Sequence, residues 1–330
     1  MAAAVSADKI LADLHKLWAG LAGDPASAGG QAVLRACAMT LVVAADESEE
    51  AASIGQVIAD VMREHPNRAI VVRVRASSDP LLEYCVTAQC WMPVGTRQQV
   101  CCEQIEITAS DASLPGLMPV LLAVIAPDLP LVVWCRNERL AKSFGMGPLF
   151  ERADKLLIDS AGCPDARAAL GHFASEGERG RRISDLAWTR VTRWRELVAQ
   201  VFEDPARRDL VSRIRQVSVL YAGDAPPVTA YYLAGWVMAC MRAENLETRF
   251  EAVPQVIGGI EGIVLTGDGH RISLRRANDT AVLIEMDSLL SCSAIPLLTD
   301  AELLGTELAV ASRDAIFERS LAQAARLARG

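Results

Sequence analysis

Five residues suited to binding a charged or aromatic group lie within eight positions of this 330-residue chain. They are Trp188, Arg190, Arg193, Trp194 and Arg195, in the segment SDLAWTRVTRWRELVAQVFED at 184–204. Arginine pairs its fork of N–H groups with carboxylates and phosphates, and tryptophan offers a large apolar face. These residue types fit a catalytic site, a nucleic-acid surface or a protein docking surface.

The segment is predicted to form a helix that begins after Ser184, because serine caps helix starts well. At about 100° per residue, its apolar arc covers about half of the circumference, wider than a surface helix needs. Arg190 and Arg195 fall inside this arc, and Arg193 falls just outside it. An arginine in an apolar arc needs a carboxylate or an aromatic face as its partner.

Two interpretations of these arginines stay open. In the first, they form internal ion pairs, with Glu103 or Asp159 as candidate carboxylates, while both tryptophans pack in the core. In the second, the segment is a docking helix, because tryptophan and arginine are enriched among the residues that dominate binding at protein interfaces.

Glu103 is a candidate polar site in the strand-like segment CEQIEI at 102–107. It shares a strand face with Ile105 and Ile107, since alternate residues of a strand point the same way. A carboxylate on a buried face needs a partner, and arginine is the natural candidate. The alternative is an edge strand that leaves Glu103 in solvent.

Asp159 and Ser160 form a second candidate polar site, in the segment LIDSAG at 157–162. They follow an apolar strand at its carboxyl end, where open α/β sheets bind ligands, and a following helix would offer its amino end to an anion. The alternative is that one of them caps the next helix, which both residue types favour.

Motifs for cofactors, metals and nucleophiles are absent from the sequence. It contains no phosphate-binding G-x-x-x-x-G-K-[ST] loop, and GGIEG at 258–262 has the wrong spacing for a dinucleotide fingerprint. It contains no G-x-S-x-G, HExxH or CxxC motif, and its four histidines lie far apart. We therefore expect no cofactor, no metal site and no catalytic residues.

Charge and hydropathy argue against two classes of partner. The net charge of −8 and a pI of about 5.2 disfavour nucleic acid, whose binding needs a basic surface. The longest apolar stretch, LPGLMPVLLAVIAPDLPLVVW, contains four prolines and an aspartate, so no membrane span is expected. The first residues, MAAAVSADKI, lack the apolar run of a secretory leader, which favours a cytoplasmic protein.

Nine cysteines without regular spacing indicate reduced thiols and not a disulfide framework. Cys101 and Cys102 are adjacent on a predicted strand, so their side chains point to opposite faces. We expect ordinary packing of these thiols, with redox sensing as the alternative.

The alternation of strand-like and helix-like segments predicts the fold class. Residues 1–205 are expected to form a Rossmann-like α/β domain: a mainly parallel sheet flanked by helices, without a dinucleotide fingerprint. Residues 206–330 are expected to form a smaller α+β domain, whose antiparallel strands are joined by GDG and AND turns. We also expect a helix over 79–91 and one long helix over 299–330. The strands predicted for the first domain lie at 35–45, 69–75, 98–108, 130–136 and 155–160.

Six segments, in this order and spacing, resemble the glucose-6-phosphate dehydrogenase assembly protein family, OpcA. The match spans most of the amino-terminal two-thirds, and two details differ: VVWC stands where a second tryptophan is usual, and RACAMT replaces RACTMN. The segments are RACAMTLVV (35–43), HPNRAIVV (65–72), VCCEQIEI (100–107), APDLPLVVW (126–134), ADKLLIDS (153–160) and the segment at 184–204.

The resemblance implies a non-catalytic assembly factor and allosteric activator of glucose-6-phosphate dehydrogenase in the oxidative pentose phosphate pathway. Its partner would be that enzyme, with self-association as a further expectation, and the five residues of the opening segment would contribute to the contact. One alternative is a sugar-phosphate-binding enzyme or sensor that uses Asp159 and Ser160. Another is a structural domain whose cysteines sense redox state.

Overall fold

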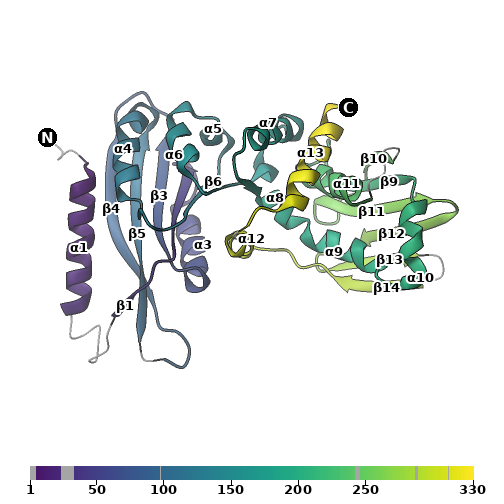
Figure 1. The fold of residues 1–330 in the computed structure, drawn as a ribbon, viewed down its shortest axis with the longest axis horizontal. Helices are drawn as coiled ribbons and strands as arrows, with labels where there is room; N and C mark the ends of the chain where they lie inside the picture. The colour runs from purple at the N-terminus through teal and green to yellow at the C-terminus, as the bar shows by residue number, and fades with distance from the viewer. Residues whose placement is uncertain (1–4, 24–32, 97, 242–245, 287–288, 311) are drawn as a thin grey trace. The chain divides into compact units, whose positions relative to one another are not determined.

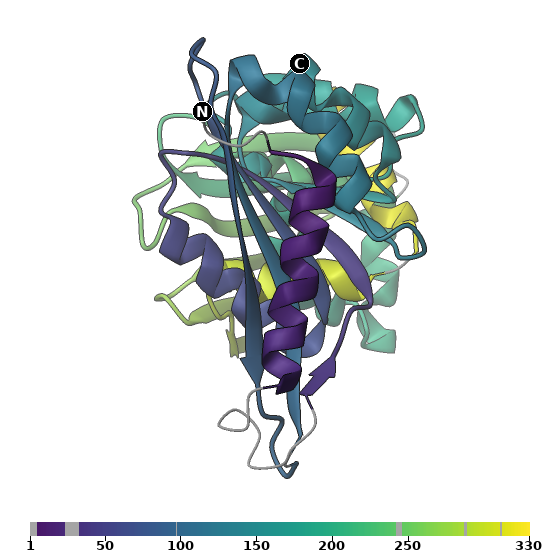
Figure 2. The same ribbon diagram turned by 90° about the vertical axis from the view of Figure 1, so that its left-hand side faces the viewer.

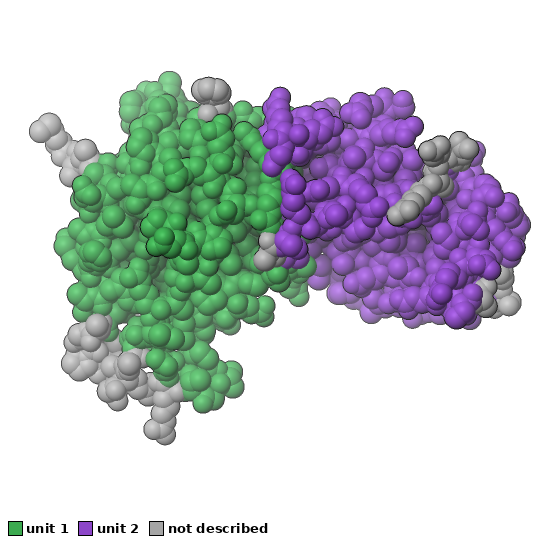
Figure 3. Space-filling model, viewed as in Figure 1, with its two compact units in different colours: residues 1–158, 181–183, 300–309 green, residues 159–180, 184–299, 310–330 purple. Residues whose placement is uncertain are grey.

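The computed structural model describes residues 5–23, 33–96, 98–241, 246–286, 289–310 and 312–330. The chain forms two compact units, coloured separately in Figure 3. The first comprises residues 1–158, 181–183 and 300–309, and the second comprises 159–180, 184–299 and 310–330. The sequence pattern changes near residue 205, whereas the compact units first divide between residues 158 and 159.

The first sheet has eight strands in the order β1-β5-β3-β2-β6-β7-β8, and β4 pairs with the other edge of β5. The pairs β1–β5, β5–β3, β3–β2, β2–β6 and β6–β7 are all parallel, and β4 is antiparallel to β5. This architecture confirms the predicted Rossmann-like class (Figure 1). The strands are β1 (Val33–Arg35), β2 (Met39–Asp46), β3 (Asn67–Arg75), β4 (Leu82–Trp91), β5 (Gln99–Ser110), β6 (Leu131–Cys135), β7 (Lys155–Ile158) and β8 (Ile183–Asp185).

Helices cover both faces of this sheet. The β2-to-β3 and β5-to-β6 connections run in opposite directions across it. Since crossovers between parallel strands are right-handed, the helices of these two connections lie on opposite faces. On one face α4 packs beside α1, which lies lengthwise along the strands in Figure 2, and on the other α3 packs beside α12. The helical elements are α1 (Ala7–Gly23), α3 (Ala51–Glu64), η1 (Asp111–Ser113), α4 (Leu114–Val124), α5 (Glu138–Ala141), η2 (Phe144–Met146), α6 (Gly147–Arg152) and α12 (Asp300–Ala309).

The expected helix over 79–91 is wrong, because these residues form strand β4. Glu83, Cys85 and Thr87 are exposed, while the residues between them are half-buried. This period of two is the pattern of a strand with one covered face. The whole length of β4 pairs with β5 in a long antiparallel hairpin.

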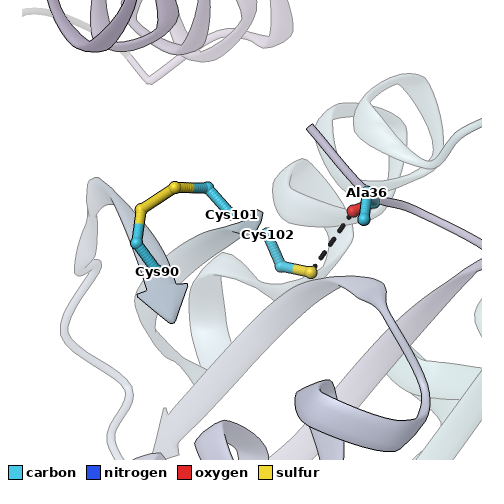
Figure 4. The surroundings of a disulfide bond; sticks show 4 residues. All are labelled: Ala36, Cys90, Cys101 and Cys102. Carbon is cyan, nitrogen blue, oxygen red and sulfur yellow. Dashed lines mark hydrogen bonds between the residues drawn. A yellow bond between two sulfur atoms is a disulfide. The ribbon is translucent and has the colours of Figure 1, made fainter. Parts of the chain in front are cut away.

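The expectation of reduced thiols is wrong at two positions, because Cys90 and Cys101 form a disulfide (Figure 4). They lie directly opposite each other in the β4–β5 register, with their α-carbons 4.1 Å apart. Cys102 points to the other face, where its thiol is buried and contacts the Ala36 carbonyl at 3.3 Å. Burial raises the pKa of the Cys102 thiol to about 11, which makes it inert as a nucleophile.

The second sheet has six strands in the order β10-β9-β11-β12-β13-β14. Only β9 and β10 run parallel, so the prediction of an α+β unit with antiparallel strands is confirmed. Asp268 and Gly269 both have left-handed backbone, with φ of 48° and 84°, as the tight β11–β12 turn requires. The strands are β9 (Gln216–Ala222), β10 (Glu247–Ala252), β11 (Gly259–Gly267), β12 (His270–Arg276), β13 (Ala281–Met286) and β14 (Leu289–Ala294).

Helix α11 is the centre of the second unit, because it is apolar around most of its circumference and lies between the sheet and α13. At their crossing, a Cβ on Gly235 would lie 2.6 Å from the Ser320 carbonyl oxygen, so only glycine permits this approach. The helical elements are η3 (Ser160–Gly162), α7 (Ala166–Glu178), α8 (Leu186–Arg190), α9 (Thr192–Val201), α10 (Pro205–Arg208), η4 (Asp209–Arg213), α11 (Val228–Met241) and α13 (Ala315–Arg329).

The single long helix expected over 299–330 is wrong, because this segment forms α12 and α13, which belong to different units. Asp314 ends the break between them. Its side chain accepts hydrogen bonds from the amides of Ile316 and Phe317, both at 2.9 Å, and so caps α13.

Candidate functional site: a cationic pocket in the second unit

The segment 184–204 forms two short helices, α8 and α9, which meet at Val191. Asp185 and not Ser184 caps α8, because the Asp185 carboxylate accepts from the amide of Ala187 at 2.9 Å. Ser184 instead lies within strand β8. The predicted helix is thus present, with its start one residue later and a break in its middle.

Trp188 belongs to the core of the second unit. It is 3% exposed, and its ring packs against Tyr232 and Phe317 with centroids 5.9 and 5.7 Å away. Its indole N–H donates to the Asp314 carboxylate at 3.2 Å. These contacts give Trp188 a role in holding α8 against α11 and α13.

The two arginines inside the apolar arc have the two kinds of partner that burial demands. Arg190 donates two hydrogen bonds to the Asp159 carboxylate, at 2.6 and 2.8 Å. The guanidinium carbon of Arg195 lies 3.5 Å from the centroid of the Trp188 ring, and its Nη2 donates to the Thr192 hydroxyl at 2.7 Å.

Glu103 is buried, at 3% exposure, in the first unit. Its carboxylate pairs with Arg35 and Arg68, and it also accepts from the indole N–H of Trp18 at 2.6 Å. The structure therefore gives Glu103 the arginine partners that the buried-face interpretation expects. These partners are not the arginines of segment 184–204.

Asp159 and Ser160 take part in an internal polar network in the second unit. Ser160 is fully buried and donates both its amide and its hydroxyl to the carboxylate of Asp185. The Tyr232 hydroxyl donates to the same carboxylate at 2.8 Å. Complete burial raises the pKa of Asp185 to about 6. Asp159 accepts from the amide of Ala161 at 3.2 Å, besides pairing with Arg190.

A cavity of about 230 Å³ lies in the second unit at the start of α9. Arg190, Val191, Arg193 and Trp194 form one side of it. The other sides come from Gly258 to Ile260, Arg276, Thr229 and residues 295–298. Three guanidinium groups line the cavity and no carboxylate does, although the whole chain carries a net charge of −8.

Arg193 is the most exposed of the three predicted site residues that line this cavity. Its side chain is 33% exposed, its Nε donates to the Ala294 carbonyl at 2.9 Å, and its Nη1 pairs with Glu196 at 3.0 Å. Trp194 is 3% exposed, and the guanidinium of Arg276 lies over its ring at 5.6 Å. The structure thus brings Arg190, Arg193 and Trp194 together around one cavity, whereas Trp188 and Arg195 lie in the packing behind it.

Sequence reasoning missed Arg276, although the sequence carries a signal for it. In HRISLRR, residues Ile272, Leu274 and Arg276 alternate on one strand face, and the first two are fully buried. Arg276 is therefore an arginine at an inward-facing position. Gly258 and Gly259, with φ of 116° and 73°, allow the loop before β11 to turn against the cavity, and no spacing rule identified them.

The carboxyl edge of the first sheet carries several ion pairs. Arg139 pairs with Asp46 and Asp111, each at 2.8 Å, and Arg136 pairs with Glu49 at 2.8 Å. The loop from β2 to α3 carries four acidic residues, Asp46, Glu47, Glu49 and Glu50, at the helix start where a dinucleotide fold presents glycines to a pyrophosphate.

Two searches of the described residues bear on other kinds of site. No group of three or more histidine, cysteine, aspartate or glutamate side chains is arranged to hold a metal ion in the part of the chain that the structure describes. Within that same part, no helix combines the length and the hydropathy needed to cross a membrane.

Two family models match the two parts of the chain. The N-terminal domain of a glucose-6-phosphate dehydrogenase subunit matches residues 58–175, and the C-terminal domain of that subunit matches residues 181–321. The chain belongs to the OpcA family. Both matches follow the order that the sequence segments indicated, and together they cover most of the residues that build the two units.

Relatives in the OpcA family include proteins of Synechocystis sp. and Synechococcus elongatus, both named as OxPP cycle proteins. The first is 29% identical over 187 residues, covering 56% of this chain and 39% of its own length. The second is 24% identical over 236 residues, covering 70% of this chain and 50% of its own length. The chain thus spans half or less of the length of these relatives.

Solved structures with a similar arrangement include a 3-ketoreductase from Actinomadura kijaniata, at a TM-score of 0.48 and 9% identity. The alignment covers 88% of this chain and 96% of that one. A dehydrogenase from Chromobacterium violaceum aligns over 88% of this chain and 94% of its own, with a TM-score of 0.47 and 10% identity.

Proposed function

We propose that this chain is a non-catalytic partner of glucose-6-phosphate dehydrogenase that promotes the assembly or activity of that enzyme in the oxidative pentose phosphate pathway. The observation that carries the proposal is the pair of family matches, because both describe domains of a subunit of this dehydrogenase. The names of the OpcA relatives agree with the pathway.

The chemistry of the first unit supports a role without catalysis. In a Rossmann-like sheet the cofactor phosphates would meet the start of α3, and here Asp46, Glu47 and Glu49 occupy that position. Glu49 is held there by Arg136, and Asp46 is held by Arg139. The hydride transfer to NADP would then belong to the partner enzyme.

The second unit supports a role in protein binding. Arg193 and Trp194 line an accessible cavity, and arginine and tryptophan dominate the binding energy at many protein interfaces. Trp188, Arg190 and Arg195 would position these residues, because their own contacts are internal. Activation requires that the chain bind the active state of the dehydrogenase more tightly than the inactive state.

The sugar-phosphate alternative at Asp159 and Ser160 has less support. The Ser160 hydroxyl and amide are both bonded to Asp185, and the Asp159 carboxylate is paired with Arg190. A phosphate at this position would meet two carboxylates.

The proposal is tested by mixing the purified chain with glucose-6-phosphate dehydrogenase from the same cell. We expect a complex on a sizing column, and a rise in turnover or in apparent affinity when glucose 6-phosphate is titrated. A mixture that elutes as separate proteins with unchanged kinetics contradicts the proposal.

The contribution of α9 is tested by Arg193→Glu, with Arg208→Glu as the matched control on the exposed face of α10. We expect the first variant to weaken the complex and the second to leave it intact. Both should change the melting temperature by only about a degree or two, since surface substitutions cost little. A large loss of stability in Arg193→Glu would instead assign this residue to the scaffold.

A further inference from the structure

Arg276 is a cation whose charge is not balanced inside the protein. Its Nε is buried without a hydrogen-bond partner, and among the described residues its Nη1 donates to the Asp279 carbonyl at 3.3 Å. Among the described residues, no carboxylate lies within ion-pair distance of this guanidinium. Burial lowers the pKa of Arg276, and the longer-range attraction of Glu261 and Asp279 offsets this effect only in part.

Glu261 is the carboxylate with the strongest electrostatic effect on Arg276, but it hydrogen-bonds to a loop and not to this arginine. Its Oε1 accepts hydrogen bonds from three successive loop amides, those of Val256, Ile257 and Gly258, at 2.8 to 3.0 Å. Glu261 therefore fixes the loop that forms one wall of the cavity, and it attracts Arg276 only at longer range. Among the described residues, no hydrogen-bond acceptor therefore reaches Arg276 Nε.

The walls of the cavity are apolar and continue onto the surface. Trp194, Ile260 and Ile295 line its interior. Leu297 and Leu298, which also line it, are 60% and 39% exposed. A ligand at this site would bury apolar area at the rim and place a negative group against the guanidinium.

We infer that this cavity receives an acidic side chain of a protein partner, next to a large apolar side chain that packs on Leu297 and Leu298. Charge complementarity selects the carboxylate, since Arg276 lines the site without a carboxylate at ion-pair distance among the described residues, whereas Arg190 and Arg193 already have carboxylate partners. The inference rests on the proposed function, because the dehydrogenase is the partner that would supply this segment.

A protein segment fits the site better than a sugar phosphate does. Thr229 carries the only hydroxyl among the lining residues, and the remaining neutral side chains are apolar. Sugar hydroxyls buried there would lose their hydrogen bonds to water. An apolar side chain has no hydrogen bonds to lose, and a carboxylate beside it would exchange water for the Arg276 guanidinium.

The test uses the full chain, glucose-6-phosphate dehydrogenase from the same cell, and a binding measurement at two salt concentrations. Arg276→Gln should weaken the complex by about 10- to 100-fold, because a carboxylate of the partner would lose its charged donor. The matched control is Arg275→Gln, since Arg275 is exposed on the opposite face of the same strand. This control should bind within about threefold of the unaltered chain.

A second pair of variants keeps the test informative if Arg276→Gln folds poorly. Leu297→Glu and Leu297→Lys both remove the same exposed apolar side chain, and they differ only in charge. Leu297→Glu should weaken the complex by at least about tenfold more than Leu297→Lys, because like charges repel across an interface. Raising the salt concentration should narrow this difference.

The outcomes separate this inference from the proposed function. If the unaltered chain does not bind the dehydrogenase, both are overturned. If it binds and all four variants bind equally well, the proposed function stands and the docking site is wrong. If glucose 6-phosphate or inorganic phosphate, without the dehydrogenase, raises the melting temperature of the unaltered chain but not of Arg276→Gln, the cavity is a small-anion site and the inference is likewise overturned.

Discussion

The carboxyl edge of the first sheet and the pocket of the second unit both gather arginines, but they balance the charge differently. At the edge, Arg136 pairs with Glu49 and Asp300, and Arg139 pairs with Asp46 and Asp111. In the pocket, Arg276 has no carboxylate within ion-pair distance in the described part of the chain. The comparison teaches that a balanced cluster satisfies its arginines internally, whereas an unbalanced one leaves a position for a carboxylate from outside.

The largest effect is expected where a balanced charge is also buried. Glu103→Gln leaves Arg68, whose side chain is only 12% exposed, without its counter-charge. We expect the free energy of unfolding to fall by about 3 kcal/mol or more, because breaking a buried pair strands the remaining ion. Urea unfolding of the variant and the unaltered chain measures this, and a loss below about 1 kcal/mol would show that the pair contributes little.

The next effect concerns the buried carboxylate of Asp185 in the second unit. Burial raises the pKa of this group from 3.8 to about 6. Because the folded state holds this proton more tightly than the unfolded state, the stability from this group is greatest below pH 4 and falls as pH rises to about 6. Relative to Asp185→Asn, which does not titrate, the unaltered chain should lose up to about 3 kcal/mol between pH 4 and pH 7. Urea unfolding of both proteins at both pH values tests this direction. If the unaltered chain instead becomes more stable relative to Asp185→Asn as pH rises, the prediction is wrong.

A smaller effect is expected at the carboxyl edge itself. Arg139→Gln removes pairs with Asp46 and Asp111, but the arginine side chain is 37% exposed and its partners are also reached by water. Since exposed ion pairs stabilise proteins weakly, we expect a loss of about 1 kcal/mol, reduced in high salt. Thermal unfolding at two salt concentrations distinguishes this from a purely steric effect, which salt would not change.

The smallest effect on stability is expected at the unbalanced arginine. Arg276→Gln should change the free energy of unfolding by less than about 1 kcal/mol, because a partly buried cation without a counter-charge stabilises little. Chemical unfolding provides the measurement. A loss as large as that of Glu103→Gln would mean that Arg276 is a structural residue, and the contrast between the two regions would disappear.

The fold could be predicted where a segment's own pattern determines its structure. Residues 69–72 and 131–135 are continuous apolar runs, so the burial of β3 and β6 on both faces was visible in the sequence. Residues 79–91 were misread as a helix because they mix apolar and polar residues, and only their pairing with β5 covers one face. The Cys90–Cys101 bond was hidden for the same reason, since it depends on the register of a hairpin that the sequence did not reveal.

The candidate site was only partly predictable. Asp159 was one of two candidate partners, with Glu103, because an arginine in an apolar arc requires a carboxylate or an aromatic face, and the structure pairs Asp159 with Arg190. Arg276, Gly258 and residues 295–298 come from distant parts of the chain and meet α9 only in the folded second unit. No spacing rule joins positions that lie about a hundred residues apart.

Helix α12 has a consequence for the order in which the chain can fold during synthesis. Lys155, 6% exposed on β7, donates to the Glu307 carboxylate at 2.9 Å, and α12 packs beside α3. The first unit therefore waits for residues 300–309, which leave the ribosome after nearly all of the second unit. Until then a lysine bound for the interior keeps its charge in water, so a nascent chain carries an open first unit while residues 159–299 are made. Fragments that stop before residue 300 should share this exposure, and molecular chaperones would meet the same surface.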